Sequence, residues 1–200
     1  MHPNAAFRHG DRNLLETLIE QIGFGMVFAD TPDGPRVAHV PLLSTGDGAV
    51  QFHLARGNAL TRHLAGSTAL IVINGPDGYV SPRWYADPAQ VPTWNYVALE
   101  LEGRVRRIDA EALLALVTTL SDKHEAQVSE GAPWTMAKLP PESLRRLLAS
   151  IVGFELEVTA WRETVKLSQN KSADEIERVA AGLEREGSIA IAQLMRTLAK

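Results

Sequence analysis

The chain has 200 residues, which is the size of one domain or of one domain with a small appendage. It contains no cysteine, which excludes disulfides, thiolate metal ligands and a cysteine nucleophile. Its net charge of −4 is not the basic surplus typical of a nucleic-acid-binding protein. The N-terminal stretch MHPNAAFRHGDRN lacks the apolar run of a signal peptide, and no stretch approaches the ~18 apolar residues of a membrane span. We therefore expect a soluble, cytoplasmic protein without a membrane partner.

The first half of the chain reads mainly as strands. Asp11 is a candidate cap for a first helix that carries an apolar stripe through Ile22. Strands are expected at residues 24–30, 36–44, 49–55, 68–76 and 94–108. The run at 68–76 is continuously apolar, which predicts a strand buried on both faces. Residues 58–66 read as a short helix or turn opened by Asn58.

Helices dominate the second half. They are expected at residues 109–125, from Pro141 onward, at 172–186 and at 188–200, with a long loop at 126–140. Ser172 and Glu175 have the spacing of a capping box. Residues 153–161 alternate as a last strand. The pattern predicts an α+β protein built on a small antiparallel barrel or sandwich, with inserted helices and a helical C-terminal tail. We place a domain boundary near residue 170, giving a barrel domain at 1–170 and a helical extension at 171–200.

Aromatic residues are unevenly spread. Only 6% of the chain is aromatic, yet five aromatic residues lie close together at Tyr79, Trp84, Tyr85, Trp94 and Tyr96. Strand alternation puts Trp94 and Tyr96 on the face that carries Glu100, opposite the core face of Val97 and Leu99. Large aromatic side chains on an outward face need cover. A helix, a partner subunit and a planar ligand are all compatible with this pattern.

Several motifs together carry a family resemblance. SPRWY, VPTWNY, HVPLLS, FHLARGN and VGFELEVT…VKLSQNKS occur in an order and spacing that resemble the PaiB-type, FMN-binding negative transcriptional regulators. The resemblance extends over nearly the whole chain. It implies an FMN-binding split β-barrel, an antiparallel Greek-key-like barrel of the flavin-reductase and pyridoxamine-phosphate-oxidase type. It also implies a homodimer with FMN at the subunit interface, where the aromatic cluster would line the flavin site and the dimer seam.

The resemblance suggests where the flavin binds. A flavin phosphate needs cations and N–H donors, and its ring needs flat apolar walls. Arg56, Gly57 and Asn58 are expected at the phosphate, because Gly57 allows close approach and Asn58 would open a helix whose N-terminus favours an anion. Pro41 marks an edge or bulge that leaves the backbone of His39 and Val40 free to meet the ring. The alternatives are a surface arginine, a helix cap and a protected sheet edge.

The remaining expected cofactor-binding residues come from the other motifs. They are Trp84, Trp94, Asn95, Lys166, Gln169 and Asn170. The last three lie in VKLSQNKS, which could reach the phosphate or the polar edge of the ring. Its alternative reading is a polar loop that leads into the Ser172 cap.

No catalytic residue is assigned, because flavin chemistry belongs to the cofactor. No metal site is assigned either, because no H-x-x-x-H or H-E-x-x-H pattern occurs. Three functions remain open. The first is a flavin-binding regulator, the second is an FMN-dependent oxidoreductase that uses a reduced nicotinamide, and the third is a haem-binding or haem-degrading split barrel with His39 or His53 as iron ligand.

DNA is a possible partner that the charges support weakly. Residues 171–200 contain five basic and five acidic side chains. Arg104, Arg106 and Arg107 form a small cluster, which we read as a solvated face paired with Glu100 and Glu102. A regulatory role would therefore be indirect, or the family label describes a genetic effect rather than contact with DNA.

Overall fold

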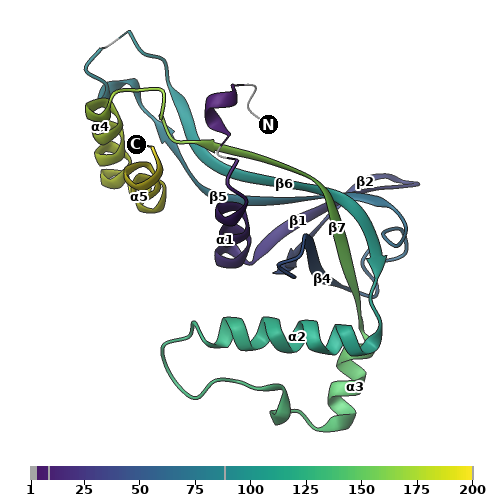
Figure 1. Ribbon diagram of the computed structural model, residues 1–200. Coiled ribbons are helices and arrows are strands. Elements are labelled where there is room, and N and C mark those ends of the chain that lie inside the picture. Colours follow the sequence, from purple (N-terminus) through teal and green to yellow (C-terminus); the bar gives the residue numbers. More distant parts are fainter. Residues whose placement is uncertain (1–3, 9, 88, 200) are drawn as a thin grey trace. The chain divides into compact units, whose positions relative to one another are not determined.

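The computed structural model describes residues 4–8, 10–87 and 89–199 (Figure 1). The strands are β1 (Phe24–Thr31), β2 (Gly34–Pro41), β3 (Leu43–Ser44), β4 (Ala49–Ala55), β5 (Thr68–Val80), β6 (Thr93–Arg107) and β7 (Ile151–Lys166). The α-helices are α1 (Arg12–Ile22), α2 (Ala110–Glu125), α3 (Pro141–Ala149), α4 (Ala173–Arg185) and α5 (Ile189–Leu198). Three 3-10 turns are η1 (Ala5–Phe7), η2 (Pro82–Trp84) and η3 (Met136–Lys138).

All seven strands form one sheet that curls on itself. Their order is β2-β1-β5-β6-β7-β4-β3. β1 pairs antiparallel with β2 and β5, and β4 pairs antiparallel with β3 and β7. β2 passes into β3 through the single buried residue Leu42, and β2 also contacts β4. Strands from the two ends of the order therefore meet and close a barrel. The predicted α+β barrel with inserted helices and a helical tail is confirmed.

The barrel core follows from strand alternation. Every second residue of β1, β4 and β6 is buried, including Val27, Phe52 and Leu99. The rings of Phe52 and Phe154 stack across β4 and β7 with their centroids 5.7 Å apart. Gly103 is required where β6 meets β7, because a Cβ there would lie 1.9 Å from the carbonyl oxygen of Glu157. This close approach explains why the strand has a glycine at this position.

The chain divides into two compact units. Unit 1 comprises Met1–Leu15, Asn74–Leu99 and Arg162–Lys200, and unit 2 comprises Glu16–Ile73 and Glu100–Trp161. In unit 1, α4 and α5 lie side by side (Figure 1). In unit 2, α2 contacts α3 and β4 and buries a small cluster of Ile108, Leu113, Leu116 and Leu120. A domain boundary at residue 170 stays a prediction.

One local expectation was wrong. The apolar run at 68–76 is not buried on both faces, because within it only Ala69, Ile71 and Ile73 are buried while Leu70 and Val72 are half-buried. This run therefore faces the core on one side only. Residues 58–66 form successive turns, which is one of the two expected readings.

Candidate functional site

The structure separates the twelve expected cofactor-binding residues into two groups. His39, Val40, Pro41, Arg56, Gly57 and Asn58 belong to unit 2. Trp84, Trp94, Asn95, Lys166, Gln169 and Asn170 belong to unit 1. Each group is described within its own unit.

In unit 2, two of these residues lie on an apolar sheet surface. Directly opposite residues of antiparallel strands point to the same side, and the register pairs Phe24 with Pro41, Met26 with His39 and Phe28 with Val37. These six residues form what we call the β1–β2 face. Phe24 is 52% exposed and Val37 is 43% exposed, which is unusual for such large apolar side chains. Val40 lies between His39 and Pro41 in the sequence, but its side chain points into the core. Only its backbone therefore belongs near this face.

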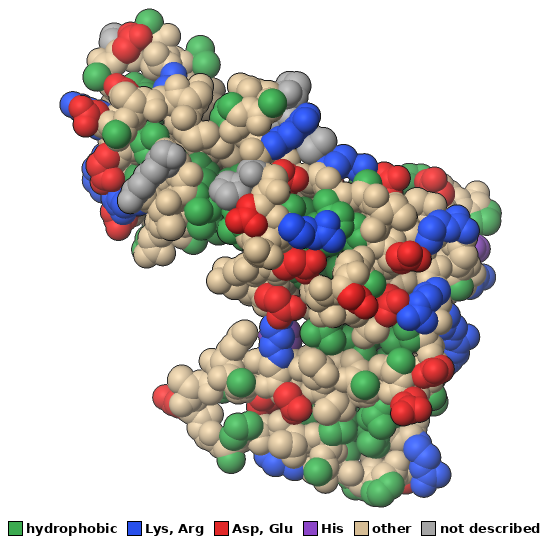
Figure 2. Space-filling model, in the orientation of Figure 1, with side chains coloured by type: hydrophobic (Ala, Val, Ile, Leu, Met, Phe, Trp, Pro, Cys, Tyr) green, Lys and Arg blue, Asp and Glu red, His purple; other side chains and the backbone are tan. Residues whose placement is uncertain are grey.

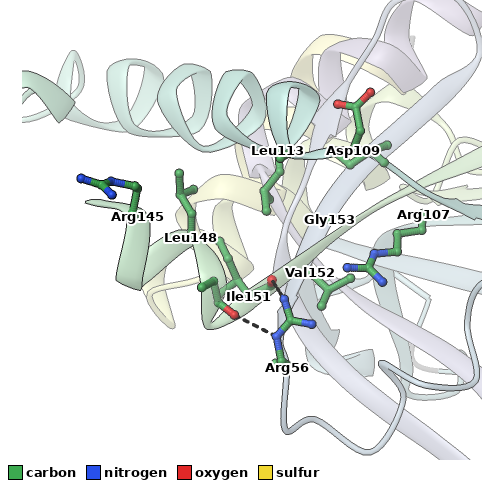
Figure 3. Close-up of a pocket in the computed structure, with 12 residues that line it drawn as sticks. Arg56, Arg107, Asp109, Leu113, Arg145, Leu148, Ile151, Val152 and Gly153 are labelled. Atoms are coloured by element: carbon green, nitrogen blue, oxygen red, sulfur yellow. Dashed lines mark hydrogen bonds between the residues drawn. The ribbon is translucent and has the colours of Figure 1, made fainter. Parts of the chain in front are cut away.

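Arg56 follows β4 and is anchored by backbone oxygens. Its Nε donates to the carbonyl oxygen of Ala149 at 2.8 Å, and its Nη2 donates to that of Ile151 at 3.4 Å. The side chain lines a cavity of about 640 Å³ (Figure 3). Two more arginines, Arg107 and Arg145, line the same cavity. The sequence did not single these two out as binding residues.

The neighbours of Arg56 do not form the expected helix N-terminus. The side-chain oxygen of Asn58 accepts a hydrogen bond from the backbone N–H of Leu60 at 2.9 Å, which stabilises a turn. The helix-dipole argument for an anion at Asn58 is therefore wrong, because no helix follows it. A Cβ built at Gly57 would meet nothing within 4 Å, so there is open space beside this backbone.

In unit 1, Tyr79 and Trp94 lie at the surface, whereas Tyr85 is buried. Trp94 is 53% exposed and Tyr79 is 48% exposed, and their rings meet edge to face with centroids 6.1 Å apart. Trp94 and Tyr96 line a cavity of about 410 Å³. Trp84 and Tyr79 line another of about 750 Å³. The outward orientation predicted for Trp94 is confirmed.

Asn95 lies beneath this surface and is fully buried. Its Nδ2 donates to Ser168 Oγ at 2.9 Å and contacts Met195 Sδ at 3.3 Å. The network joins the motifs VPTWNY and KLSQNKS to α5. Ser168 holds its place in a left-handed backbone conformation, with φ of 63°. Strand alternation, which puts Asn95 with Val97 on the core face, is the signal that could have revealed this position.

The KLSQNKS segment mostly binds its own unit. Lys166 Nζ donates to the carbonyl oxygen of Trp94 at 2.6 Å and to Thr93 Oγ1, and burial lowers its pKa. Gln169 Nε2 donates to the carbonyl oxygens of Val165 at 2.6 Å and Ala6 at 3.1 Å. Asn170 is exposed. Cofactor contacts for these three residues stay predictions.

His53 is the most unusual histidine. It lies on β4 opposite Gly153, and its Nδ1 is buried without a hydrogen-bond partner among the described residues. Burial lowers its pKa. Among all the residues that the structure describes, no group of three or more histidine and acidic residues is arranged to hold a metal ion.

Several basic side chains pair with acidic ones. In the tail, the Arg196 guanidinium pairs with Glu177 and with Glu184, each at 3.0 Å. Arg106 pairs with Glu155 at 2.6 Å. Figure 2 shows acidic and basic side chains interspersed over the visible face. Among the described helices, none is long and apolar enough to cross a membrane.

Comparisons with known proteins agree with this picture. Residues 1–160 match the family described as "Putative FMN-binding domain". The chain is 30% identical over 172 residues to the Bacillus subtilis "Protease synthase and sporulation protein PAI 2", covering 84% of this chain and 82% of that protein.

Two solved structures share the fold at low identity. They are the FAD and heme binding protein from Mycobacterium smegmatis (TM-score 0.61, 21% identity, 86% of this chain and 78% of that chain) and the flavocytochrome Anf3 from Azotobacter vinelandii (TM-score 0.63, 14% identity, 83% and 72%). At this identity they establish the split-barrel fold alone. The family match and the Bacillus relative go further: the chain belongs to the PaiB-type family of FMN-binding split barrels, and FMN is the cofactor assigned to it.

Proposed function

We propose that the protein binds FMN as a homodimer, with the ring on the β1–β2 face and the phosphate at Arg56, Gly57 and Asn58. Both parts of this site belong to unit 2, where β2 contacts β4. The observation that carries the proposal is that unit 2 contains both the exposed apolar β1–β2 face and an anchored arginine with unused N–H donors.

The β1–β2 face fits a flavin ring. An isoalloxazine ring needs a flat apolar wall and a few hydrogen bonds from the protein. Phe24 and Val37 supply exposed apolar surface, and His39 supplies a polar side chain between them. The ring would shield part of this surface from water.

Arg56 fits the phosphate. A guanidinium has five N–H donors, and the two contacts with Ala149 and Ile151 use two of them. The remaining donors can bind phosphate oxygens without releasing the anchor. The open space beside Gly57 leaves room for an anion to approach the backbone.

The homodimer follows from the remaining exposed apolar surface. One flavin ring cannot cover all six residues of the β1–β2 face, and an apolar surface of this kind commonly marks an interface. In a symmetric dimer the same patch of each subunit meets its copy.

Bound FMN would supply hydride or electron transfer, and the residues described here would bind and orient it. We propose that flavin occupancy or redox state regulates the dimer, in keeping with the regulatory role implied by the resemblance. The Arg196 side chain in the tail is already paired with Glu177 and Glu184, so it is not free to contact DNA. This favours an indirect effect on DNA. An FMN-dependent oxidoreductase is the alternative.

Haem binding is a second alternative, favoured by one observation. His39 is exposed on the β1–β2 face, and the names of both structural neighbours refer to haem or to a cytochrome. An exposed imidazole can ligate iron.

The test is an absorption spectrum of the full chain before and after addition of FMN, and separately of haemin. The proposal predicts flavin bands that stay with the protein through gel filtration. Arg56→Ala should weaken FMN binding by about tenfold or more, which corresponds to the loss of one charge-assisted contact. Arg62→Ala, an exposed arginine in the same loop, is the matched control. Retention of haemin with a Soret band, and no retention of FMN, would instead establish the haem alternative.

A further inference from the structure

The cavity beside Arg56 has the size and walls of a small-molecule site. It lies between the start of α2, the end of α3 and the first residues of β7, with a volume of about 640 Å³ (Figure 3). Known ligand pockets are of this order of size. Its walls are mainly apolar, formed by Ile108, Leu113, Leu148, Ala149, Ile151 and Val152.

The charges at this cavity are opposite to those of the whole protein. Three arginines and one acidic residue, Asp109, line it, while the chain has a net charge of −4. The Asp109 carboxylate caps α2 by accepting the N–H of Ala112 at 2.8 Å. Arg145 makes an exposed pair with Glu142 at 2.9 Å, which is a weak interaction. The cavity therefore attracts anions.

Arg56 and Arg107 both line the cavity, together with Val152 (Figure 3). The bonds to the carbonyl oxygens of Ala149 and Ile151 fix the orientation of Arg56. Arg107 makes no hydrogen bond or ion pair with any residue in the described part of the chain. A phosphate or carboxylate between them would satisfy donors that otherwise bind only water.

We propose that this cavity binds an anionic ligand with an apolar body. Its phosphate or carboxylate is held by Arg56 and Arg107, and its apolar part packs against Leu148 and Ile151. Arg56 is also the proposed flavin-phosphate residue. Where the anion is the flavin phosphate, the inference rests on the proposed function, and only the phosphate end of FMN enters the cavity while the ring lies on the β1–β2 face. The same chemistry would hold a separate small anion.

Calorimetric titration of the full chain with octyl phosphate tests the site. The proposal predicts saturable binding that octanol does not reproduce, because octanol lacks the charge. Arg107→Ala should weaken binding about tenfold or more. Arg104→Ala, an exposed arginine on the same strand but outside the cavity, should leave it unchanged. Ala110→Trp, at an exposed lining position, should block binding by filling the cavity. Unchanged melting temperatures show that the variants fold.

Octyl phosphate affinity that is the same in Arg107→Ala and in the wild type would overturn the inference, as would equal binding of octanol. Titrations with FMN and with riboflavin then show whether the anion that binds here is the flavin phosphate or a separate molecule. If the anion is the flavin phosphate, FMN competes with octyl phosphate, and Arg107→Ala weakens FMN but not riboflavin. If it is a separate molecule, Arg107→Ala weakens octyl phosphate but leaves the affinity for FMN unchanged. If the wild type binds octyl phosphate but no FMN, the proposed flavin site fails and the anion site stands.

Discussion

The indole of Trp84 lies directly against the backbone of Gly182. A Cβ built at Gly182 would lie 2.2 Å from Trp84 Cδ2, closer than any side chain can come. A second close approach occurs at Gly78, where a Cβ would lie 2.6 Å from Leu183 Cδ2. Two glycines thus let α4 dock closely on the segment that carries the SPRWY motif. The aromatic residue that the sequence assigns to the cofactor also anchors the C-terminal helices of unit 1.

Gly182→Ala should destabilise the protein by about 1–2 kcal/mol. Overpacking against Trp84 costs about 1–3 kcal/mol, and the better helix propensity of alanine offsets somewhat less than 1 kcal/mol of it. Urea unfolding measures the difference. Gly57→Ala, where a Cβ meets open space, is the control and should change little. A stabilised Gly182→Ala would show that Trp84 does not pack here.

Asn95→Ala should reduce the free energy of unfolding by about 1–3 kcal/mol, because it removes a buried hydrogen bond with Ser168 and leaves that hydroxyl poorly satisfied. Denaturant unfolding gives the stability, and an FMN titration of the folded variant gives the affinity. A large loss of affinity with unchanged stability would contradict the structural role and favour direct contact with the cofactor.

Stability should depend on the protonation of His53. Burial lowers its folded-state pKa below the usual 6.5, so the unfolded chain binds the proton more readily. Stability is therefore retained above about pH 6.5 and falls as the pH drops toward the folded-state pKa. The free energy of unfolding is measured for the wild type and for His53→Phe at about pH 7.5 and about pH 5.5. Because all other groups titrate in both proteins, the difference between the two pH effects isolates the contribution of His53. An equal loss in both proteins would rule out His53 as the source.

Val37→Asp should disrupt the homodimer. It places a charge in the exposed apolar β1–β2 face, and desolvating that charge in an interface is costly. Light scattering of the wild type should give the mass of two chains, and of the variant the mass of one. Arg36→Asp, on the same strand and also exposed, places a charge next to this face rather than within it and should remain dimeric. A wild type that is monomeric at all concentrations would contradict the proposed seam.

The sequence predicted the strands and most helices because their alternation and caps are local signals. The barrel residues Val97 and Leu99 and the cap Asp109 are examples. Contacts between residues far apart in the sequence could not be predicted from such local signals. Glu175 was expected to complete a capping box, but its side chain instead accepts the N–H of Ala86, far away in the sequence. Ser172 still caps α4 by accepting the N–H of Glu175 at 3.4 Å.

The candidate site shows the same division. The exposed position of Trp94 could be read from alternation, whereas the partners of Asn95 and Lys166 depend on tertiary contacts. Arg107 was read as part of a solvated face, because its place beside Arg56 arises only when β6, β7 and α3 come together. The turns after Asn58 replaced a helix that the local pattern also allowed.

The most direct test of the central claim is an equilibrium titration of the full chain with FMN, followed by flavin fluorescence. The account predicts saturable quenching that ends at one FMN per chain, with Arg56→Ala weaker by about tenfold or more and Arg62→Ala unchanged. Fluorescence that stays at the level of free FMN, even with protein in excess, would contradict flavin binding at this site.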